Sequence, residues 1–291
     1  MKNKLFVCTI ALLFLAGSVL PLLAQPPKIL MIEREDIKPG KSAPHEKLAH
    51  EFVQVFTKAK SEGHWLGMTP ISGNENEAVF LGGYPSFEAM EKDHMNLEKA
   101  EGGALMSEVE KLDAQSADIH TSQRAVLAVL RENLSYRLQD ITRDSMAHSR
   151  IFEIETFRVR LGHSGEFADG AKIYFSAMEK ANVNTPVALY QVISGAPSGT
   201  YFAISAMKSM KEMDAGNEKA VMAALGEENG KKLQMFERES IMSSESNLYA
   251  ISPKMSYVSK EFAAADPEFW TPKPKATKAA TKPAAKENPK Q

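Results

Sequence analysis

Two glutamates at matched places are the residues of this chain best suited to do chemistry. Glu33 and Glu155 lie 122 positions apart, each inside a segment with the composition of a central β-strand. A buried carboxylate must find a partner, face water or shift its pKa, because burial disfavours the charged form. One interpretation is a polar group in a ligand cavity, present twice. The other is a salt bridge to Arg34, Arg158 or a helix lysine.

Aromatic side chains on neighbouring predicted strands could line the same cavity. They are also common in strands because they pack well there, so a plain core is the alternative. Tyr84 is one of the aromatic residues that could line this cavity. The predicted cavity residues are Glu33, Glu155, Trp65, Tyr190 and Tyr201. No catalytic residue can be assigned, since the chain has no Ser-His-Asp signature and no glycine-rich phosphate loop.

The histidines do not show a metal-site pattern. His45 and His50 in "HEKLAHE" are five residues apart, which is about 140° around a helix. A zinc peptidase needs histidines at i and i+4 on one face. The second half of the chain has Phe167 and Lys172 at these places. We therefore expect a solvated helix face, no metal and no cofactor; the other histidines are scattered, at His64, His94, His120, His148 and His163.

The segments that must position these residues occur twice. The tripeptide ISG stands at 71–73 and again at 193–195, an offset of 122. The same offset places "ILMIEREDIKPGKS" (29–42) over "IFEIETFRVRLGHS" (151–164) with five identities, where about one is expected by chance. The chain therefore contains a diverged duplication.

Each copy has the same order of predicted elements, β-α-β-β-α-β, which is that of a ferredoxin-like unit. Gly40 and Gly162 follow the first strands, where a positive φ costs glycine little. In each ISG the glycine leads from a strand into a hairpin. The predicted strands are 29–37, 65–72, 77–83 and 123–131, then 150–160, 186–194, 199–205 and 246–252; the predicted helical stretches are 43–62, 85–116, 165–182 and 207–239.

The ends of the chain differ from its body. Lys2 and Lys4 precede an apolar run that stops at Ala24, which predicts a signal peptide over 1–24 and export to a periplasmic or extracellular place. Cys8, the single cysteine, lies within it. The segment 271–291 is made almost entirely of Lys, Ala, Thr and Pro, so we expect it to be disordered. The predicted repeats are 28–131 and 150–262, with 132–149 between them.

Charge separates the body from the tail. Residues 25–270 carry 27 basic and 36 acidic side chains, a net charge of −9, which argues against nucleic acid as a partner. The tail carries six lysines and one glutamate. It could contact an anionic envelope, although such an attraction would be weak and sensitive to salt.

The motif "IFEIETFRVRLGHSGEF" (151–167), together with the element order, resembles the dimeric α+β barrel superfamily and most of all its NIPSNAP-type branch. In that superfamily two ferredoxin-like units pack sheet to sheet, usually as a homodimer. Two copies in one chain imply an intramolecular barrel, a pseudo-dimer that could be complete as a monomer.

The resemblance leaves function open, because members include haem-degrading monooxygenases, cofactor-free oxygenases, chlorite dismutase-like haem proteins and proteins without known activity. His64-Trp65 and His94 are similar to the Trp/His pairing of haem-degrading members, but the spacing differs. Our first hypothesis is a non-catalytic exported protein that binds a small apolar or aromatic ligand, or a partner. The alternative is a cofactor-independent or haem-dependent monooxygenase.

Overall fold

The computed structural model describes residues 26–99 and 104–271. The predicted signal peptide (1–24) lies outside the described residues, as does the predicted tail apart from Thr271. Within the described part of the chain, none of the helices combines the length and apolar character needed to cross a membrane.

The two repeats have the same order of strands and helical segments, although the first has an α-helix, α2 (Phe87–Lys99), where the second has a short 3-10 helix, η4 (Met210–Ala215). The first consists of β1 (Ile29–Ile37), α1 (Ser42–Ala59), β2 (Trp65–Pro70), β3 (Glu77–Tyr84), α2 (Phe87–Lys99), α3 (Ala104–Ser116) and β4 (His120–Leu130). The second consists of β5 (Ile151–Val159), α5 (Ser164–Lys180), β6 (Ala188–Ser194), β7 (Thr200–Met207), η4 (Met210–Ala215), α6 (Glu218–Ser240) and β8 (Ile241–Tyr257). The predicted tandem β-α-β-β-α-β fold is confirmed.

The strands form one closed barrel in the order β1-β3-β2-β8-β5-β7-β6-β4. Each repeat contributes four adjacent strands, and all pairs are antiparallel. The two sheets join where β2 pairs with β8 and where β4 pairs with β6. A single chain therefore builds the barrel predicted for a pseudo-dimer.

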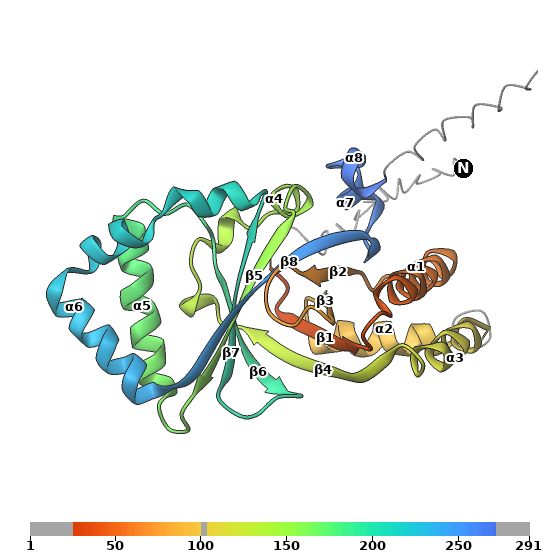
Figure 1. Cartoon of the computed structure of the whole chain (residues 1–291), viewed down its shortest axis with the longest axis horizontal. Helices are drawn as coiled ribbons and strands as arrows, with labels where there is room; N and C mark the ends of the chain where they lie inside the picture. Colours follow the sequence, from red (N-terminus) through yellow and green to blue (C-terminus); the bar gives the residue numbers. More distant parts are fainter. Residues whose placement is uncertain (1–25, 100–103, 272–291) are drawn as a thin grey trace, which may run out of the picture.

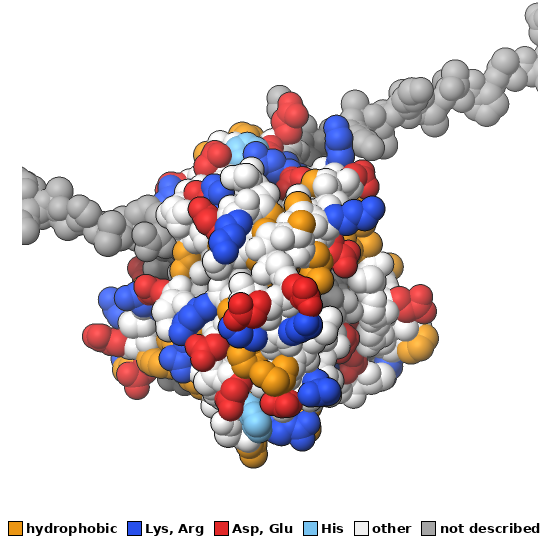
Figure 2. Space-filling view, turned by 90° about the vertical axis from the view of Figure 1, so that its left-hand side faces the viewer, with side chains coloured by type: hydrophobic (Ala, Val, Ile, Leu, Met, Phe, Trp, Pro, Cys, Tyr) orange, Lys and Arg blue, Asp and Glu red, His pale blue; other side chains and the backbone are white. Residues whose placement is uncertain are grey.

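Alternation along the strands separates the barrel interior from the helical layers. Leu30 and Ile32 of β1, with Phe152 and Ile154 of β5, belong to the large buried cluster inside the barrel. The intervening residues face outward, toward the helices. Figure 1 shows α1, α2 and α3 on one side of the barrel and α5 and α6 on the other. On the α5–α6 side, acidic and basic side chains are interspersed (Figure 2).

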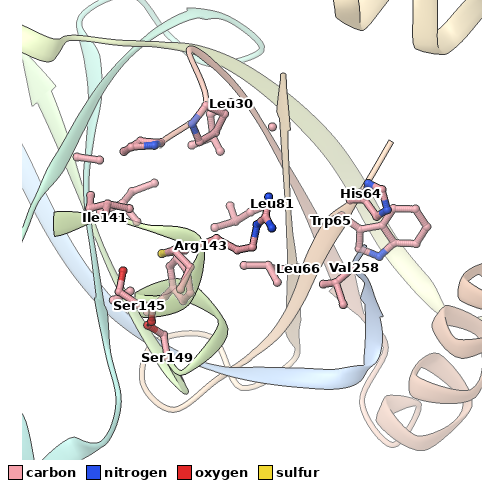
Figure 3. A pocket seen from close by; sticks show the side chains of 18 of the residues that line it. Leu30, His64, Trp65, Leu66, Leu81, Ile141, Arg143, Ser145, Ser149 and Val258 are labelled. Atoms are coloured by element: carbon pink, nitrogen blue, oxygen red, sulfur yellow. The ribbon is translucent and has the colours of Figure 1, made fainter. Parts of the chain in front are cut away.

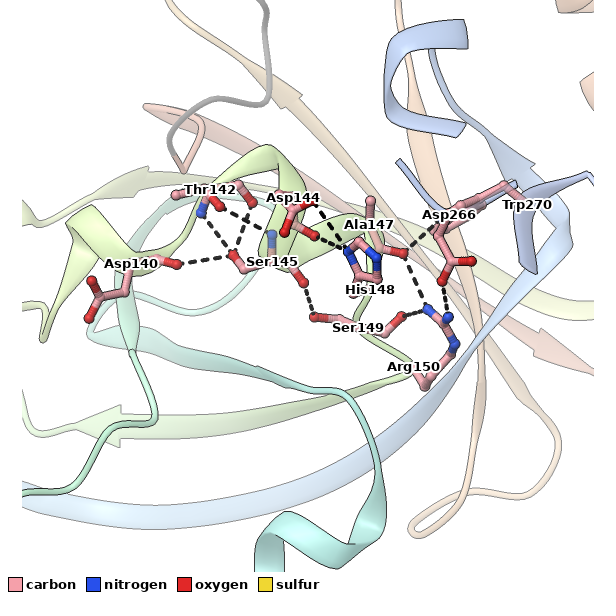
Figure 4. Close-up of polar contacts among 10 residues, drawn as sticks. All are labelled: Asp140, Thr142, Asp144, Ser145, Ala147, His148, Ser149, Arg150, Asp266 and Trp270. Atoms are coloured by element: carbon pink, nitrogen blue, oxygen red, sulfur yellow. Dashed lines mark hydrogen bonds and ion pairs between the residues drawn. The ribbon is translucent and has the colours of Figure 1, made fainter. Parts of the chain in front are cut away.

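One end of the barrel is covered by the connecting segment and the C-terminal residues. The covering elements are η3 (Leu138–Asp140), α4 (Arg143–Ala147), α7 (Lys260–Ala263) and α8 (Pro267–Trp270). The connecting segment begins with η2 (Glu132–Leu134), which packs in the helical layer of the second repeat. The Trp270 indole N–H donates to the Ala147 carbonyl at 2.9 Å, and Arg150 pairs with Asp266 (Figure 4). Phe262 and Trp270 are buried with the barrel core.

Two predicted strands are longer than the sequence indicated. The prediction of 246–252 is wrong in extent, because β8 runs from Ile241 to Tyr257 and pairs first with β5 and then with β2. The first residues of β8 are mostly exposed and only its later part alternates, so one alternating pattern does not run through the strand. Likewise β4 begins at His120 rather than at 123.

The predicted backbone role of the repeated glycines is confirmed. Gly73 and Gly195, the glycines of the two ISG tripeptides, have φ of 92° and 85°. Gly40 and Gly162 have φ of 77° and 87°. These values lie in the region that glycine adopts without steric cost.

Candidate functional site

A cavity of about 720 Å³, here called the outer cavity, lies between the outward face of the first sheet and the helices α1, α2 and α3. Its strand residues include Met31, Glu33 and Glu35 of β1, all at alternate positions. Its helix residues include an α1 stripe at three- and four-residue steps, which turns one face to the sheet. That stripe consists of His45, Leu48, Ala49, Phe52 and Phe56.

Three titratable side chains meet at one end of the outer cavity. The His45 Nε2 atom lies 2.6 Å from Glu35 Oε2, and His120 Nε2 lies 3.4 Å from the same oxygen. The two imidazole rings are 5.2 Å apart between centroids. The side chains of His45, His120 and Glu35 are 3%, 9% and 12% exposed, so the group is almost completely withdrawn from water.

A β-bulge brings His120 to this place. The register of β1 with β4 shifts after Asp36, so that Ile37 lies opposite His120 and Thr121 is skipped. A bulge reverses the alternation of the strand beyond it. His120 therefore lines the same cavity as Gln123, although three positions separate them.

Gln123 connects the three side chains to Glu33. Its amide donates to Glu33 Oε1 and, at 3.2 Å, to Glu35 Oε1. Burial raises the pKa of Glu33, and the nearby Glu35 and Asp113 carboxylates raise it further, against the hydrogen bond from Gln123. Burial also lowers the pKa of His120, more than Glu35 raises it. Burial thereby favours the neutral form of the His120 imidazole.

The other end of the outer cavity is aromatic. Trp65 meets Phe56 edge-on at 5.0 Å and donates its indole N–H to the Met255 carbonyl at 2.8 Å. The Tyr84 hydroxyl donates to Asp93 at 3.1 Å, and burial together with this carboxylate raises the pKa of Tyr84. The walls thus offer aromatic faces whose own polar atoms are already satisfied.

The described residues that line the outer cavity include five carboxylates and neither lysine nor arginine: Glu33, Glu35, Glu91, Asp93 and Asp113. Such a wall attracts cations and repels anions. Haem carries two propionates that need cationic partners, and this wall offers neither lysine nor arginine for them.

In the second repeat the equivalent positions are packed with apolar side chains. Phe157, Phe167 and Ile241 stand where the first repeat has Glu35, His45 and His120, by the shared offset and by the shared register at the bulge. They pack with Tyr201 in one cluster. Tyr201 lies opposite Phe157, whereas Ala78 lies opposite Glu35.

A second cavity, of about 910 Å³, lies at the covered end of the barrel (Figure 3). Inward-facing leucines of the first sheet and residues of the connecting segment line it, among them Leu66, Leu81 and Ile141. The Ser145 and Ser149 hydroxyls are engaged in local bonds around α4 (Figure 4). This cavity is larger, but the buried titratable groups converge on the outer cavity, which is the better candidate site.

The structure does not bring the predicted cavity residues together. Glu33 and Trp65 line the outer cavity, and Trp65 lines the barrel-end cavity as well. Tyr190 lies in the barrel-end cavity, where its hydroxyl donates to the Pro27 carbonyl at 2.9 Å. Tyr201 lies in the packed cluster of the second repeat. Glu155 lies in the other helical layer.

The salt bridges considered for the two glutamates do not form either. Arg34 points into the barrel and pairs with Glu77 at 3.0 Å, while Arg158 donates to Thr200 at 2.6 Å. Among the described residues Glu155 has neither a hydrogen bond nor an ion pair. Burial, with Glu153 and Glu237 nearby, raises the pKa of Glu155 to about 7.

Sequence reasoning missed the group of Glu35, His45 and His120. His50, which was paired with His45 in the sequence, is exposed and contacts the Lys254 carbonyl at 3.2 Å. A usable signal was present, because His45 aligns with an apolar residue, Phe167, in the other repeat. A polar residue on a helix stripe that is apolar in the sister repeat indicates a site rather than a core.

Comparison with known proteins gives the fold. No protein family description and no curated sequence matches this chain. A provisionally assigned monooxygenase of Fusobacterium nucleatum subsp. nucleatum is similar in structure, with a TM-score of 0.50 and 12% identity over 78% of this chain and 93% of that one. An anthrone oxidase-like protein has a TM-score of 0.50 and 13% identity over 79% of this chain and 93% of that one.

Chlorite dismutase from Candidatus Nitrospira defluvii is more distant, with a TM-score of 0.44 and 6% identity over 80% of this chain and 94% of that one. At these identities the likeness concerns the fold alone. The closed eight-stranded barrel of two ferredoxin-like repeats gives this protein the dimeric α+β barrel fold, built within one chain.

Proposed function

We propose that the protein binds a small, neutral or cationic, mainly aromatic or apolar molecule in the outer cavity, without transforming it. The observation that carries this proposal is the difference between the repeats. The second repeat fills the space beneath its helices with Phe157, Phe167 and Tyr201, whereas the first leaves about 720 Å³. That volume is within the range of small-molecule sites, roughly 300 to 1,000 Å³.

The lining explains the ligand class. Aromatic side chains such as Phe52, Phe56 and Trp65 offer apolar faces, which also attract cations. The carboxylates at the cavity wall disfavour an anion. A neutral or cationic aromatic molecule satisfies both conditions.

The likeness in fold to an anthrone oxidase-like protein supports a cofactor-independent oxygenase as the second candidate. The haem-dependent version has no support from the charges of the outer cavity, which has neither lysine nor arginine among its described lining residues. Incubating the protein with haem tests it directly, because a shifted Soret band would indicate binding and overturn our interpretation of the wall.

The proposal also covers the location of the protein and the branch of the superfamily to which it is assigned. The motif at 151–167 supports a place in the NIPSNAP-type branch, and the charged and apolar pattern of 1–24 supports export with cleavage near Ala24. A basic tail that touches an anionic envelope agrees with that location. The internal barrel needs no second copy to close, which supports a monomer.

Two probes of similar shape and different charge test the binding function. N-phenyl-1-naphthylamine is neutral and becomes fluorescent in apolar sites, and 8-anilino-1-naphthalenesulfonate is its anionic counterpart. With EDTA present, we expect saturable binding of the neutral probe and binding of the anionic one weaker by about tenfold or more. Equal binding of the two, or none of the neutral probe, would overturn the proposal.

Gly82→Leu provides the matched variant. A Cβ at Gly82 would make ordinary contacts, 3.7 Å from Met31, and Gly82 lines the outer cavity, so a leucine here takes up part of that space. Gly165→Leu adds the same side chain where nothing lies within 4 Å. We expect the neutral probe to bind the Gly82→Leu variant more weakly than it binds the wild type. Its affinity for the Gly165→Leu variant should equal that for the wild type.

A further inference from the structure

Glu35, His45 and His120 each offer one ligand atom, and these three atoms lie within 4.8 Å of one another. We propose that they bind one divalent transition-metal ion, with its remaining coordination positions open to the outer cavity. All three residues line that cavity, so a bound ion would face whatever enters it. The proposal goes beyond ligand binding and does not depend on it.

The donor set selects the kind of metal. Two imidazole nitrogens and one carboxylate oxygen suit zinc, iron, cobalt or nickel, whereas calcium and magnesium prefer oxygen ligands throughout. Three protein ligands fill only part of the coordination sphere, which is the arrangement of sites that bind a water or a substrate. A closed structural site would supply a fourth side chain.

The two distances from the imidazole nitrogens to the carboxylate suit an ion after small movements. Two donors at about 2.1 Å from a common ion are roughly 3 to 3.5 Å apart. His120 Nε2 is already 3.4 Å from Glu35 Oε2, while His45 Nε2 at 2.6 Å must move outward by less than the length of a bond. The three side chains come from β1, α1 and β4, whose pairing fixes their backbones.

His120 is the strongest single indication. Its ring nitrogens are both buried and neither makes a hydrogen bond in the described structure, although Nε2 lies 3.4 Å from Glu35. A buried polar group without a partner is rare and requires an explanation. A metal ion at Nε2 supplies the missing partner, and a neutral imidazole is the form that binds it.

Gln123 holds the carboxylate in the required orientation. It donates to Glu35 Oε1 at 3.2 Å, which leaves Oε2 directed at the two imidazoles. Outer hydrogen bonds of this kind fix the direction of metal ligands in many sites. The arrangement therefore has ligands, an orienting partner and an open side.

The second repeat shows that the fold itself does not need these polar groups. Phe157, Phe167 and Ile241 occupy the equivalent backbone positions and pack as an apolar cluster. Burying a carboxylate and two imidazoles costs free energy that the apolar version avoids. A ligand for the three donors accounts for their presence in one repeat alone.

The test uses untagged full-length protein, stripped with EDTA and dialysed, with no organic ligand added. Titration with Co²⁺ should produce visible ligand-field bands that saturate at one ion per chain, and Zn²⁺ should displace them. Calorimetry with Zn²⁺ should give the same stoichiometry. Absence of the bands, or binding only in large excess, would overturn the proposal.

The variants assign the ligands. Glu35→Gln keeps the shape of the side chain, and we expect Zn²⁺ affinity to fall by about tenfold or more. His120→Ile, which introduces the residue of the second repeat, should remove the Co²⁺ bands. His50→Phe, five positions after His45 on an exposed face, should leave both unchanged. Bands that survive His120→Ile or vanish with His50→Phe would contradict the assignment.

Folding and ligand binding can be separated from this result. Circular dichroism of each variant shows whether it is folded, and the wild-type Co²⁺ titration stands even if a variant is not. The naphthylamine assay is performed in EDTA. Metal binding and ligand binding can therefore fail independently.

Discussion

His45 and Phe167 occupy the same position in the two repeats, in the first turn of the helix that follows the first strand. Phe167 packs against Phe157 and Tyr201, with ring centroids 5.5 and 4.6 Å away. His45 instead lies 2.6 Å from Glu35. The same backbone arrangement therefore holds an aromatic cluster in the second repeat and titratable groups in the first.

Transferring the aromatic cluster to the first repeat should stabilise the metal-free protein. In the triple variant Glu35→Phe, His45→Phe, His120→Ile we expect the free energy of unfolding in EDTA to rise by about 1–3 kcal/mol, because apolar replacements of buried charged groups are often stabilising. Urea unfolding measures it. His50→Phe serves as the control, with an expected change below about 0.5 kcal/mol. A less stable triple variant would contradict the comparison of the repeats.

Glu155 should make stability depend on pH. The pKa of Glu155 in the folded protein is raised to about 7, mainly by burial, above the ordinary glutamate value of 4.5. The folded state then holds the proton more tightly than the unfolded state, so stability falls as pH rises from about 4.5 through 7. We expect Glu155→Gln to be more stable than wild type by about 1–2 kcal/mol at pH 8, after allowance for partial exposure, and equal to it at pH 4. Urea unfolding at both values measures this, and a difference that is the same at both would contradict it.

The ion pair between Arg34 and Glu77, inside the barrel, should contribute to stability as an energetically coupled pair. Arg34 and Glu77 are 14% and 5% exposed, and the Tyr249 hydroxyl donates to Glu77 at 2.9 Å. Glu77→Ala leaves the arginine buried without its partner, and we expect a loss of about 3–5 kcal/mol. The double variant Arg34→Met, Glu77→Leu should lose far less than the sum of the single changes. Additive losses in a double-mutant cycle would show that the pair is not coupled.

Gly195 should tolerate no side chain, unlike Gly162. Both have positive φ, 85° and 87°. A Cβ at Gly195 would lie 2.1 Å from the Ala125 carbonyl oxygen, whereas at Gly162 nothing lies within 4 Å. We expect Gly162→Ala to cost about 1–2 kcal/mol for the backbone conformation alone, and Gly195→Ala to cost more than about 3 kcal/mol. Thermal unfolding of the two variants compares them; similar losses would remove the steric argument.

Much of the fold could be predicted because the chain carries it twice. The offset of 122 between Ile29 and Ile151 aligned the elements, and the glycines of the turns marked their ends. Alternation correctly grouped Met31 with Glu33 on one face. Alternation cannot tell which face lies inside the barrel. The interpretation that places Glu33 and Glu155 in a ligand cavity therefore fails to separate them, although they lie in different helical layers.

Only part of the candidate site could be predicted from the sequence. Glu35 follows from Glu33 by alternation, and His45 lies on the apolar stripe of its helix. His120 does not follow, because the bulge beside Ile37 reverses the alternation of β4 and no residue type marks it. Pairing between strands, rather than local pattern, decides where this side chain points.

The position of β8 in the barrel also determines when, during synthesis, the barrel can close. Its second half covers the edge of β2, where Trp65 pairs with Tyr257, and it is the last strand in the described part of the chain. Until it is synthesised and delivered, the first repeat presents an unpaired strand edge, and such edges invite association with other chains. A ribosome that releases the chain from its N-terminus therefore exposes the half-barrel from the moment β4 is complete at Leu130 until β8 is complete at Tyr257.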